Sequence, residues 1–163
     1  HKHAILLLCI YYRTAENYTQ QAKNFKTKNI MEIESIKVGK TRIGMHYSNP
    51  EGAVNKNVYY CRVEISYVGI KKKKTCYLFD VLYSIYQGTL SCSDFFVIGT
   101  NTEYRIYNDA GEFITSLPVD VGRPVGVQTD AFVLLKGSTI TGYGKDGKAI
   151  GSKELSPEEL KQL

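Results

Sequence analysis

The sequence predicts a mainly β fold built from antiparallel hairpins, with a helix near the start of the chain and a short helix at its end. Three observations predict this class. One pattern of strands and turns occurs twice, 36 residues apart. From residue 31 onward, apolar and polar residues alternate with the period of two that is typical of strands. Short apolar runs are separated by turns rich in Gly, Asp and Asn.

The repeat is the clearest pattern in the chain. Residues 94–117 align with residues 130–153 without a gap, and seven of the 24 aligned positions are identical. Ordinary residue frequencies give about one or two identities. The identical pairs are Asp94 and Asp130, Phe96 and Phe132, Val97 and Val133, Tyr107 and Tyr143, Gly111 and Gly147, Ile114 and Ile150, and Ser116 and Ser152.

Each copy of the repeat predicts a hairpin closed by a tight turn. Phe95–Ile98 and Ala131–Leu135 are apolar throughout, as strands buried on both faces are. Thr102–Tyr107 alternates and follows the first of these runs. Asn108–Gly111 and Gly144–Gly147 are turns, because Asn and Asp tolerate left-handed backbone and Gly adopts it without a Cβ clash. We therefore expect the two turns to occupy equivalent places in successive hairpins.

Part of the repeat resembles a known architecture. Pro124-Val125-Gly126-Val127, followed by Phe132–Leu135 and the turn at Asp146-Gly147, resembles a blade of β-propellers of the NHL or quinoprotein-like kind. The segment from Arg105 to Gly111 resembles the end of such a blade, so the resemblance covers roughly residues 90–155. It implies sheets arranged around an axis. A small β-domain of ordinary meander hairpins is the alternative.

Length and composition are those of one soluble domain with a basic first half. The chain has 163 residues, of which 43% are hydrophobic and 23% are charged, and its net charge is +5. Residues 1–30 carry five Lys or Arg and one acid, residues 31–90 carry nine and five, and residues 91–163 carry seven and ten. The basic first ninety residues favour an anionic partner, nucleic acid above all.

Residues 1–30 are predicted to precede an antiparallel β-domain of residues 31–163. Ala4–Tyr12 is a nine-residue apolar run that is too short to span a bilayer, and it suits a buried strand or the start of a hydrophobic helix. Thr14–Ile30 has apolar residues at helical spacing among Gln, Asn and Lys, which predicts an amphipathic helix.

The β-domain is predicted to begin with two hairpins. Ile33–Val38 and Thr41–Tyr47 form the first, around a turn at Gly39-Lys40. Val58–Val68 alternates most clearly, and we expect it to pair with Thr75–Phe79. Together with the repeat, this alternation predicts a core that includes Phe96, Val97, Phe132, Val133, Tyr59, Val63 and Ile65.

The end of the chain predicts a helix start. Ser156-Pro157-Glu158-Glu159 is a capping box with Pro at the first helical position. Leu160 and Leu163 lie three residues apart on one side of this helix. We expect them to contact a protein partner or a further part of the same chain.

A basic run beside aromatic residues is the candidate binding site. Single-stranded nucleic acid requires cations for its phosphates and aromatic rings on which its bases stack. The candidate residues for binding nucleic acid or another anion are Lys71, Lys72, Lys73, Lys74 and Tyr77. The alternative is a solvated turn whose like charges discourage edge-to-edge pairing of strands.

No metal, cofactor or catalytic site is predicted. The four cysteines, at positions 9, 61, 76 and 92, lack the spacing of zinc ligands, and the three histidines do not complete a ligand set. His46 has no neighbouring acid or thiol in sequence. One of the last three cysteines could meet His46 only through the fold, and none precedes a helix start that would activate a thiol.

The sequence therefore favours a non-catalytic binding or scaffold module of unknown ligand, built from propeller-like β-hairpins. One alternative is binding to nucleic acid or another anionic surface through the basic first half. A second alternative is an enzyme whose site is not recognisable from sequence. The expected partner is a protein or a further part of the same chain, with no cofactor and no membrane span. Because no disulfide pattern is present, a reducing compartment such as the cytoplasm is favoured.

Overall fold

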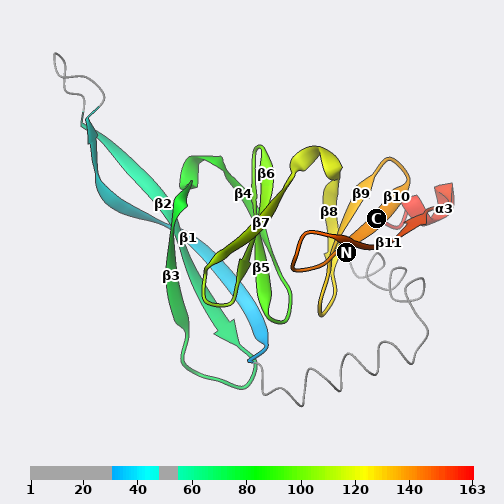
Figure 1. Ribbon diagram of the computed structural model, residues 1–163, viewed down its shortest axis with the longest axis horizontal. Coiled ribbons are helices and arrows are strands. Elements are labelled where there is room, and N and C mark those ends of the chain that lie inside the picture. Colours follow the sequence, from blue (N-terminus) through cyan, green and yellow to red (C-terminus); the bar gives the residue numbers. More distant parts are fainter. Residues whose placement is uncertain (1–30, 48–54) are drawn as a thin grey trace.

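The structure, a computed structural model, describes residues 31–47 and 55–163. These residues form three sheets that follow one another in a row along the long axis of the molecule (Figure 1). Sheet A has the strand order β1-β2-β3, sheet B the order β4-β5-β6-β7, and sheet C the order β11-β10-β9-β8. Every pairing within them is antiparallel, so the predicted mainly β, antiparallel class is confirmed.

The strands of sheet A are longer than those of the other two sheets. Sheet A contains β1 (Ile33–Tyr47), β2 (Asn55–Tyr67) and β3 (Lys74–Leu82). Sheet B contains β4 (Tyr86–Ser91), β5 (Phe95–Thr100), β6 (Glu103–Asn108) and β7 (Phe113–Pro118). Sheet C contains β8 (Arg123–Val127), β9 (Phe132–Lys136), β10 (Thr139–Tyr143) and β11 (Ala149–Glu154). A helical segment follows each sheet in sequence: η1 (Tyr83–Ile85), η2 (Val119–Val121) and α3 (Pro157–Leu160), the one α-helix among the described residues.

Sheets B and C are two copies of one structural unit. Repeat I, residues 83–118, contains η1 and β4–β7, and repeat II, residues 119–154, contains η2 and β8–β11. Each boundary in repeat II lies 36 residues after its counterpart, within one residue. The repeat is therefore longer than the sequence identities alone indicated, because it includes the helical turn and the first strand of each sheet.

Backbone geometry within the repeats also recurs. The turns predicted as equivalent both end in a left-handed glycine, Gly111 with φ of 82° and Gly147 with φ of 75°. Asn108 N donates to Glu112 O in the first turn, and the bond 36 residues later, from Gly144 N to Lys148 O, closes the second. The repeated turn chemistry thus produces the same local hydrogen bonding twice.

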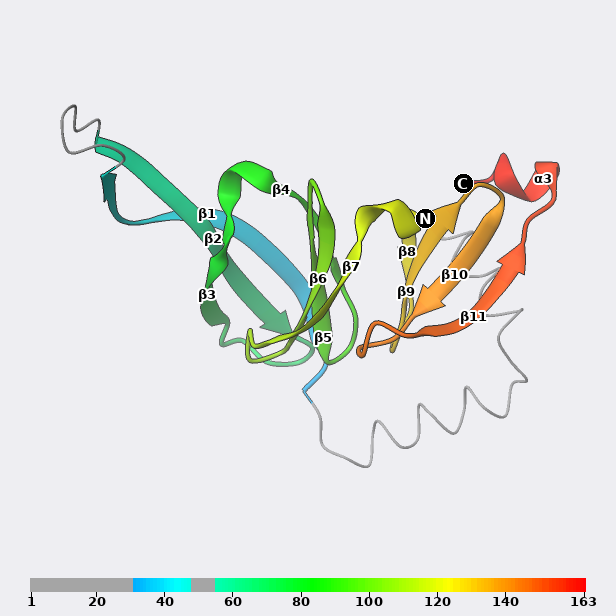
Figure 2. The same ribbon diagram turned by 45° about the horizontal axis from the view of Figure 1, so that its top comes forward.

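The resemblance to β-propeller blades is wrong. In the described residues the three sheets stay separate layers, and none of them closes on itself or curves into a ring (Figures 1 and 2). A repeated hairpin pattern specifies the strands and turns within one sheet, whereas a ring also requires a fixed rotation between neighbouring sheets. Side-chain packing between the sheets sets that rotation, and the repeat of turns carries no information about it.

The apolar core lies in layers between and beside the sheets. Phe96 and Ile98 of β5 point toward sheet A, whereas Phe95 and Val97 point toward sheet C, so β5 is buried on both faces. The layer between sheets A and B contains Ile33, Cys61, Val63, Ile65, Tyr67, Leu78, Val81, Phe96, Ile98 and Tyr107. The layer between sheets B and C contains Cys92, Phe95, Val97, Tyr104, Ile106, Phe132 and Leu134. A third cluster on the far side of sheet C contains Val125, Val133, Leu135, Ile140 and Leu155.

Tyr59 is an error in the predicted core. The other six predicted residues are at most 1% exposed, but the side chain of Tyr59 is 38% exposed. The alternation of β2 is as predicted, because Cys61, Val63 and Ile65 face sheet B. Tyr59 lies toward the far end of β2, where the β1–β2 ribbon projects beyond sheet B (Figures 1 and 2). Alternation predicts the face that a residue occupies, not whether a second sheet covers it.

The predicted turn at Gly39-Lys40 is also wrong. β1 continues through both residues as one strand of 15 residues, and Gly39 pairs with Arg62 while Lys40 pairs with Cys61. A glycine inside a strand can mark a close approach rather than a turn. Here a Cβ on Gly39 would lie 3.9 Å from Nη2 of Arg62, which is an ordinary contact, so a larger residue would also fit at this place in the strand.

The two ends of the chain differ in what the structure describes. The predicted strand or helix at Ala4–Tyr12 and the helix at Thr14–Ile30 lie outside the described residues. The predicted helix start at Ser156 is present as α3. Ser156 Oγ accepts a hydrogen bond from Glu159 N at 3.2 Å, and Glu159 Oε1 accepts one from Ser156 N at 3.1 Å. This is the reciprocal geometry of a capping box.

Candidate functional site: an exposed aromatic and basic sheet face

The outer face of sheet A, which points away from sheet B, is rich in aromatic and basic residues. Because side chains alternate along a strand, Leu78 of β3 is buried toward sheet B while Tyr77 and Phe79 point outward. Their exposed fractions are 49% and 61%. Large exposed aromatic side chains that are contiguous mark binding surfaces more often than isolated ones do.

Three aromatic rings form one patch on this face. The rings of Tyr77 and Phe79 are stacked, with centroids 6.3 Å apart and an interplanar angle of 10°. Tyr60 of β2 meets Phe79 edge to face at a centroid distance of 6.3 Å. Tyr60, Tyr77 and Phe79 are called the aromatic patch below. The stacked pair presents ring faces and edges to solvent without large side-chain entropy to lose on binding.

Basic residues lie opposite the aromatic patch and in the turn that leads into its strand. All four lysines of the run Lys71–Lys74, called the basic turn below, are exposed just where the chain enters β3. Arg62 of β2 pairs directly with Tyr77 across the sheet, with its side chain 42% exposed. Glu64 Oε1 lies 3.4 Å from Arg62 Nη2 and is the acidic group next to this arginine. Exposed cations beside aromatic faces suit a planar anionic ligand.

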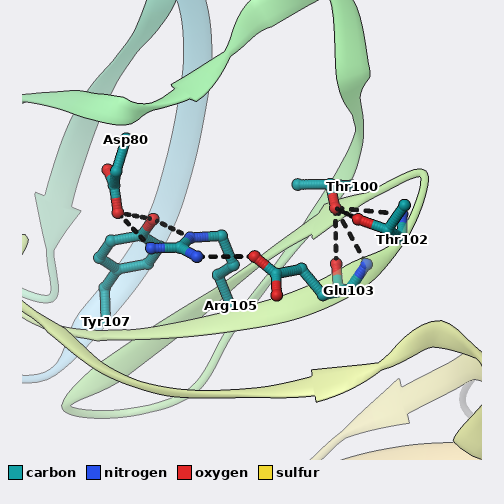
Figure 3. A network of polar contacts seen from close by, with 6 residues as sticks. All are labelled: Asp80, Thr100, Thr102, Glu103, Arg105 and Tyr107. Carbon is teal, nitrogen blue, oxygen red and sulfur yellow. Dashed lines mark hydrogen bonds and ion pairs between the residues drawn. The ribbon is translucent and has the colours of Figure 1, made fainter.

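A polar network fixes the end of the strand that carries Phe79 (Figure 3). Asp80, the next residue, forms an ion pair with Nη2 of Arg105 on β6 and accepts a hydrogen bond from Tyr107 Oη at 2.9 Å. Arg105 Nε donates to Tyr107 Oη at 2.9 Å, and its Nη1 lies 2.6 Å from Oε1 of Glu103. The network joins sheet A to sheet B, and it therefore holds β3 in position.

Burial and hydrogen bonding shift the pKa of Arg105 in opposite directions. Burial disfavours the charge of Arg105, but its hydrogen bonds to Tyr107, Glu103 and Asp80 outweigh that effect and raise its pKa. Burial is the main cause of the raised pKa of Tyr107, whose phenol stays protonated and donates to Asp80. Both groups therefore keep one protonation state across physiological pH, which is typical of a structural network rather than of a general acid or base.

A second hydrogen-bonded cluster supports Glu103 from the other side (Figure 3). The Thr100 hydroxyl accepts from the backbone N–H groups of Thr102, at 3.3 Å, and Glu103, at 3.0 Å. It also donates to the carbonyl of Glu103 at 3.1 Å. This threonine closes the turn between β5 and β6 and so fixes where the carboxylate meets Arg105.

The three cysteines in the described part of the chain show no sign of activation. Cys61 is fully buried, and burial raises the pKa of its thiol to about 11. Burial likewise raises the pKa of Cys76 and Cys92. The thiols are therefore protonated at neutral pH and behave as small apolar groups. The side chain of His46 lies outside the described residues, so whether it meets a thiol stays untested.

The remaining sequence candidates do not join this face. Leu160 and Leu163 are partly buried against the apolar cluster on the far side of sheet C, and their role as partner contacts stays a prediction. Tyr67, next to the basic turn in sequence, points toward sheet B and is 3% exposed. No group of three or more His, Cys, Asp or Glu among the described residues could hold a metal ion.

The predicted site included Tyr77 but not the other two residues of the aromatic patch. Phe79 shares the parity of Tyr77 and was detectable from the period of two. Tyr60 was not, because it reaches Phe79 across an irregularity in the β2–β3 pairing, between Tyr60↔Leu82 and Cys61↔Leu78. Register shifts of this kind have no local signature in the sequence.

Comparison with other proteins adds no assignment to these observations. No helix in the described part of the chain is both long enough and apolar enough to cross a membrane. No protein-family model matches the chain, and neither does any curated protein or solved structure.

Proposed function

We propose that the protein is a non-catalytic binding module that holds a single-stranded nucleic acid on the outer face of sheet A. The observation that carries this proposal is the exposed stack of Tyr77 and Phe79 on the strand into which the basic turn leads. Bases stack on exposed rings, and each such contact is worth about 1–3 kcal/mol. Lysines next to the rings neutralise phosphates at the same time.

The chemistry of the face favours binding with little sequence preference. The basic turn consists of lysine alone, and lysine binds phosphate as a point charge without the two-pronged geometry of arginine. Aromatic faces accept every base, because each base has a π-surface. A double helix is a poor ligand for the patch, since its bases are already stacked on one another.

The charge distribution favours binding of the ligand at the sheet A end of the molecule. Residues 31–90 carry nine Lys or Arg and five acids, whereas residues 91–163, which contain most of repeat I and all of repeat II, carry seven and ten. An anionic strand is therefore attracted to the sheet A end of the row and repelled from the sheet C end. This asymmetry makes the binding face distinct from the rest of the surface.

Fluorescence anisotropy with a labelled oligothymidine tests the proposal. Phe79→Ala, at a site that is 61% exposed, should weaken binding about tenfold because one stacking platform is lost. The double variant Lys72→Glu with Lys73→Glu should also weaken binding and should flatten the dependence of affinity on salt. The unaltered chain should bind a duplex of the same sequence more weakly.

Matched controls separate a site from a general charge effect. The double variant Lys136→Glu with Lys148→Glu makes the same change in net charge on exposed residues of repeat II. Ile150→Ala removes an apolar side chain that is 52% exposed, also in repeat II. Both controls should retain affinity. Equal losses in the two lysine doubles, or no measurable binding of oligothymidine at low salt, would refute nucleic acid as the ligand and favour a protein-binding scaffold.

A further inference from the structure

A cavity of about 540 Å³ lies where β4, β5 and β6 of sheet B meet η2 and β8. Its walls include the side chains of Leu90 and Val97, the ring of Tyr104 and the side chain of Val119. None of the described residues that line it carries a charge. A volume of this size accommodates a small molecule, and the lining suits an uncharged and mostly apolar one.

The corresponding place in repeat II is filled with side chains. The five buried residues of the cluster on the far side of sheet C are each 36 positions after a residue that lines the cavity. The pairs are Thr89 and Val125, Val97 and Val133, Gly99 and Leu135, Tyr104 and Ile140, and Val119 and Leu155. The same backbone site is therefore a cavity in repeat I and an apolar cluster in repeat II.

Two glycines account for the open space. Gly88 and Gly99 pair with each other across β4 and β5, and repeat II has Leu135 in the place of Gly99. A Cβ on Gly99 would lie 3.4 Å from Gly88 O and 3.7 Å from carbons of the Tyr104 ring, which are ordinary contacts. A Cβ on Gly88 would meet no heavy atom of the described residues within 4 Å. A larger residue at position 99 would thus fit, as Leu135 does in repeat II.

We propose that this cavity is a binding site for a small, flat, uncharged and mostly apolar molecule. The ring of Tyr104 is held in place because its hydroxyl donates to Gly122 O at 2.5 Å, so it offers a fixed aromatic wall. The inference is independent of nucleic acid binding at sheet A.

NMR titration of the protein with naphthol, naphthalene and naphthoate tests the ligand class. Naphthalene is a flat, uncharged ring system, naphthol adds a hydroxyl group, and naphthoate adds a charge. Naphthol should bind, with amide shifts centred on Leu90 and Val97. Naphthoate should bind about tenfold or more weakly, because the site offers its charge no partner. Absence of naphthol binding, or equal binding of naphthoate, would overturn the proposal.

Variants taken from repeat II locate the site. Gly99→Leu introduces the residue found at position 135 and should weaken naphthol binding about tenfold or more, with an unchanged or higher melting temperature. If this variant does not fold, Gly99→Ala, whose added methyl makes only ordinary contacts, should weaken binding by a smaller factor.

One control distinguishes the cavity from the aromatic patch. Phe79→Ala should leave naphthol binding unchanged, although it weakens binding of oligothymidine if that proposal is correct. Loss of naphthol binding in Phe79→Ala together with retained binding in Gly99→Leu or Gly99→Ala would place the ligand on the surface of sheet A and overturn the cavity as its site.

Discussion

Repeat I and repeat II have the same succession of helical turn and four strands, yet their side chains differ on both faces of the sheet. On the face toward the preceding sheet, both repeats stack a phenylalanine on a tyrosine. The centroids are 5.3 Å apart for Phe96 and Tyr107 and 5.7 Å apart for Phe132 and Tyr143. The ion pairs of Arg105 with Asp80 and Glu103 have no counterpart at the equivalent positions of repeat II, because Thr141 replaces Arg105 there.

The partners of these side chains differ in the same way. Asp80, the acid that Arg105 contacts on the last strand of sheet A, has Ser116 as its equivalent on the last strand of sheet B. On the opposite face, glycine and leucine exchange at positions 99 and 135, which changes a cavity into an apolar cluster. The comparison shows that the two repeats share their strands and turns but differ in the side chains that pack between the sheets.

The largest expected effect tests whether the shared stack is equally important in both repeats. Phe96 and Phe132 are both fully buried, so each substitution by alanine should cost about 3–5 kcal/mol of unfolding free energy. Urea denaturation measures both variants. A loss below about 1 kcal/mol for either one would show that the two repeats do not share their core. Ile150→Ala, at an exposed site, is the control that should change little.

The next effect concerns the turn at Gly147, which packs against β7 of the neighbouring sheet. A Cβ on Gly147 would lie 2.9 Å from Cγ2 of Thr115, whereas one on Gly137 would meet no described heavy atom within 4 Å, and both glycines have positive φ. Gly137→Ala should therefore cost about 1 kcal/mol from backbone strain alone. Gly147→Ala should cost about 2–3 kcal/mol, because it adds a clash.

A double variant separates the two contributions at this turn. Thr115→Ser removes the Cγ2 atom that the new methyl would meet. Combined with Gly147→Ala, it should restore the stability lost to the clash but not the part lost to φ, as measured by thermal denaturation. Equal costs for Gly137→Ala and Gly147→Ala would mean that the turn does not pack tightly on β7.

The smallest effect distinguishes the repeated aspartates. Burial, with a further contribution from the charge of Asp94, raises the pKa of Asp130 in the folded protein. A carboxyl whose folded pKa lies above its unfolded value stabilises the fold when protonated and loses that contribution as pH rises through the folded pKa. Asp130→Asn should therefore raise the melting temperature at neutral pH, and the gain should vanish as the pH falls below the usual range of aspartate.

Asp94→Asn is the matched variant and should act in the opposite direction. Asp94 lies 3.0 Å from Nζ of Lys145 in a partly exposed ion pair, so its loss should cost at most about 1 kcal/mol at neutral pH. Melting curves of both variants between acidic and neutral pH measure the contrast. A lower melting temperature for Asp130→Asn at neutral pH would show that its carboxylate is stabilising.

The sequence by itself determined the features that depend on neighbouring residues. The 36-residue period, the turns ending at Gly111 and Gly147, the buried runs Phe95–Ile98 and Ala131–Leu135 and the capping box at Ser156 all follow from backbone preference and alternation. Such features need only a few adjacent positions to specify them. The basic turn and Tyr77 were predicted as a candidate site for the same reason.

The tertiary structure alone decided how these local units combine. β1 runs through Gly39 because β2 continues beside it, and Tyr59 is exposed because sheet B ends before reaching it. Tyr60 joins the aromatic patch through a register shift, and the cavity at Gly99 exists because η2 and β8 approach sheet B there. Each depends on how whole sheets are placed, and that placement is set by many distant side chains packing at once.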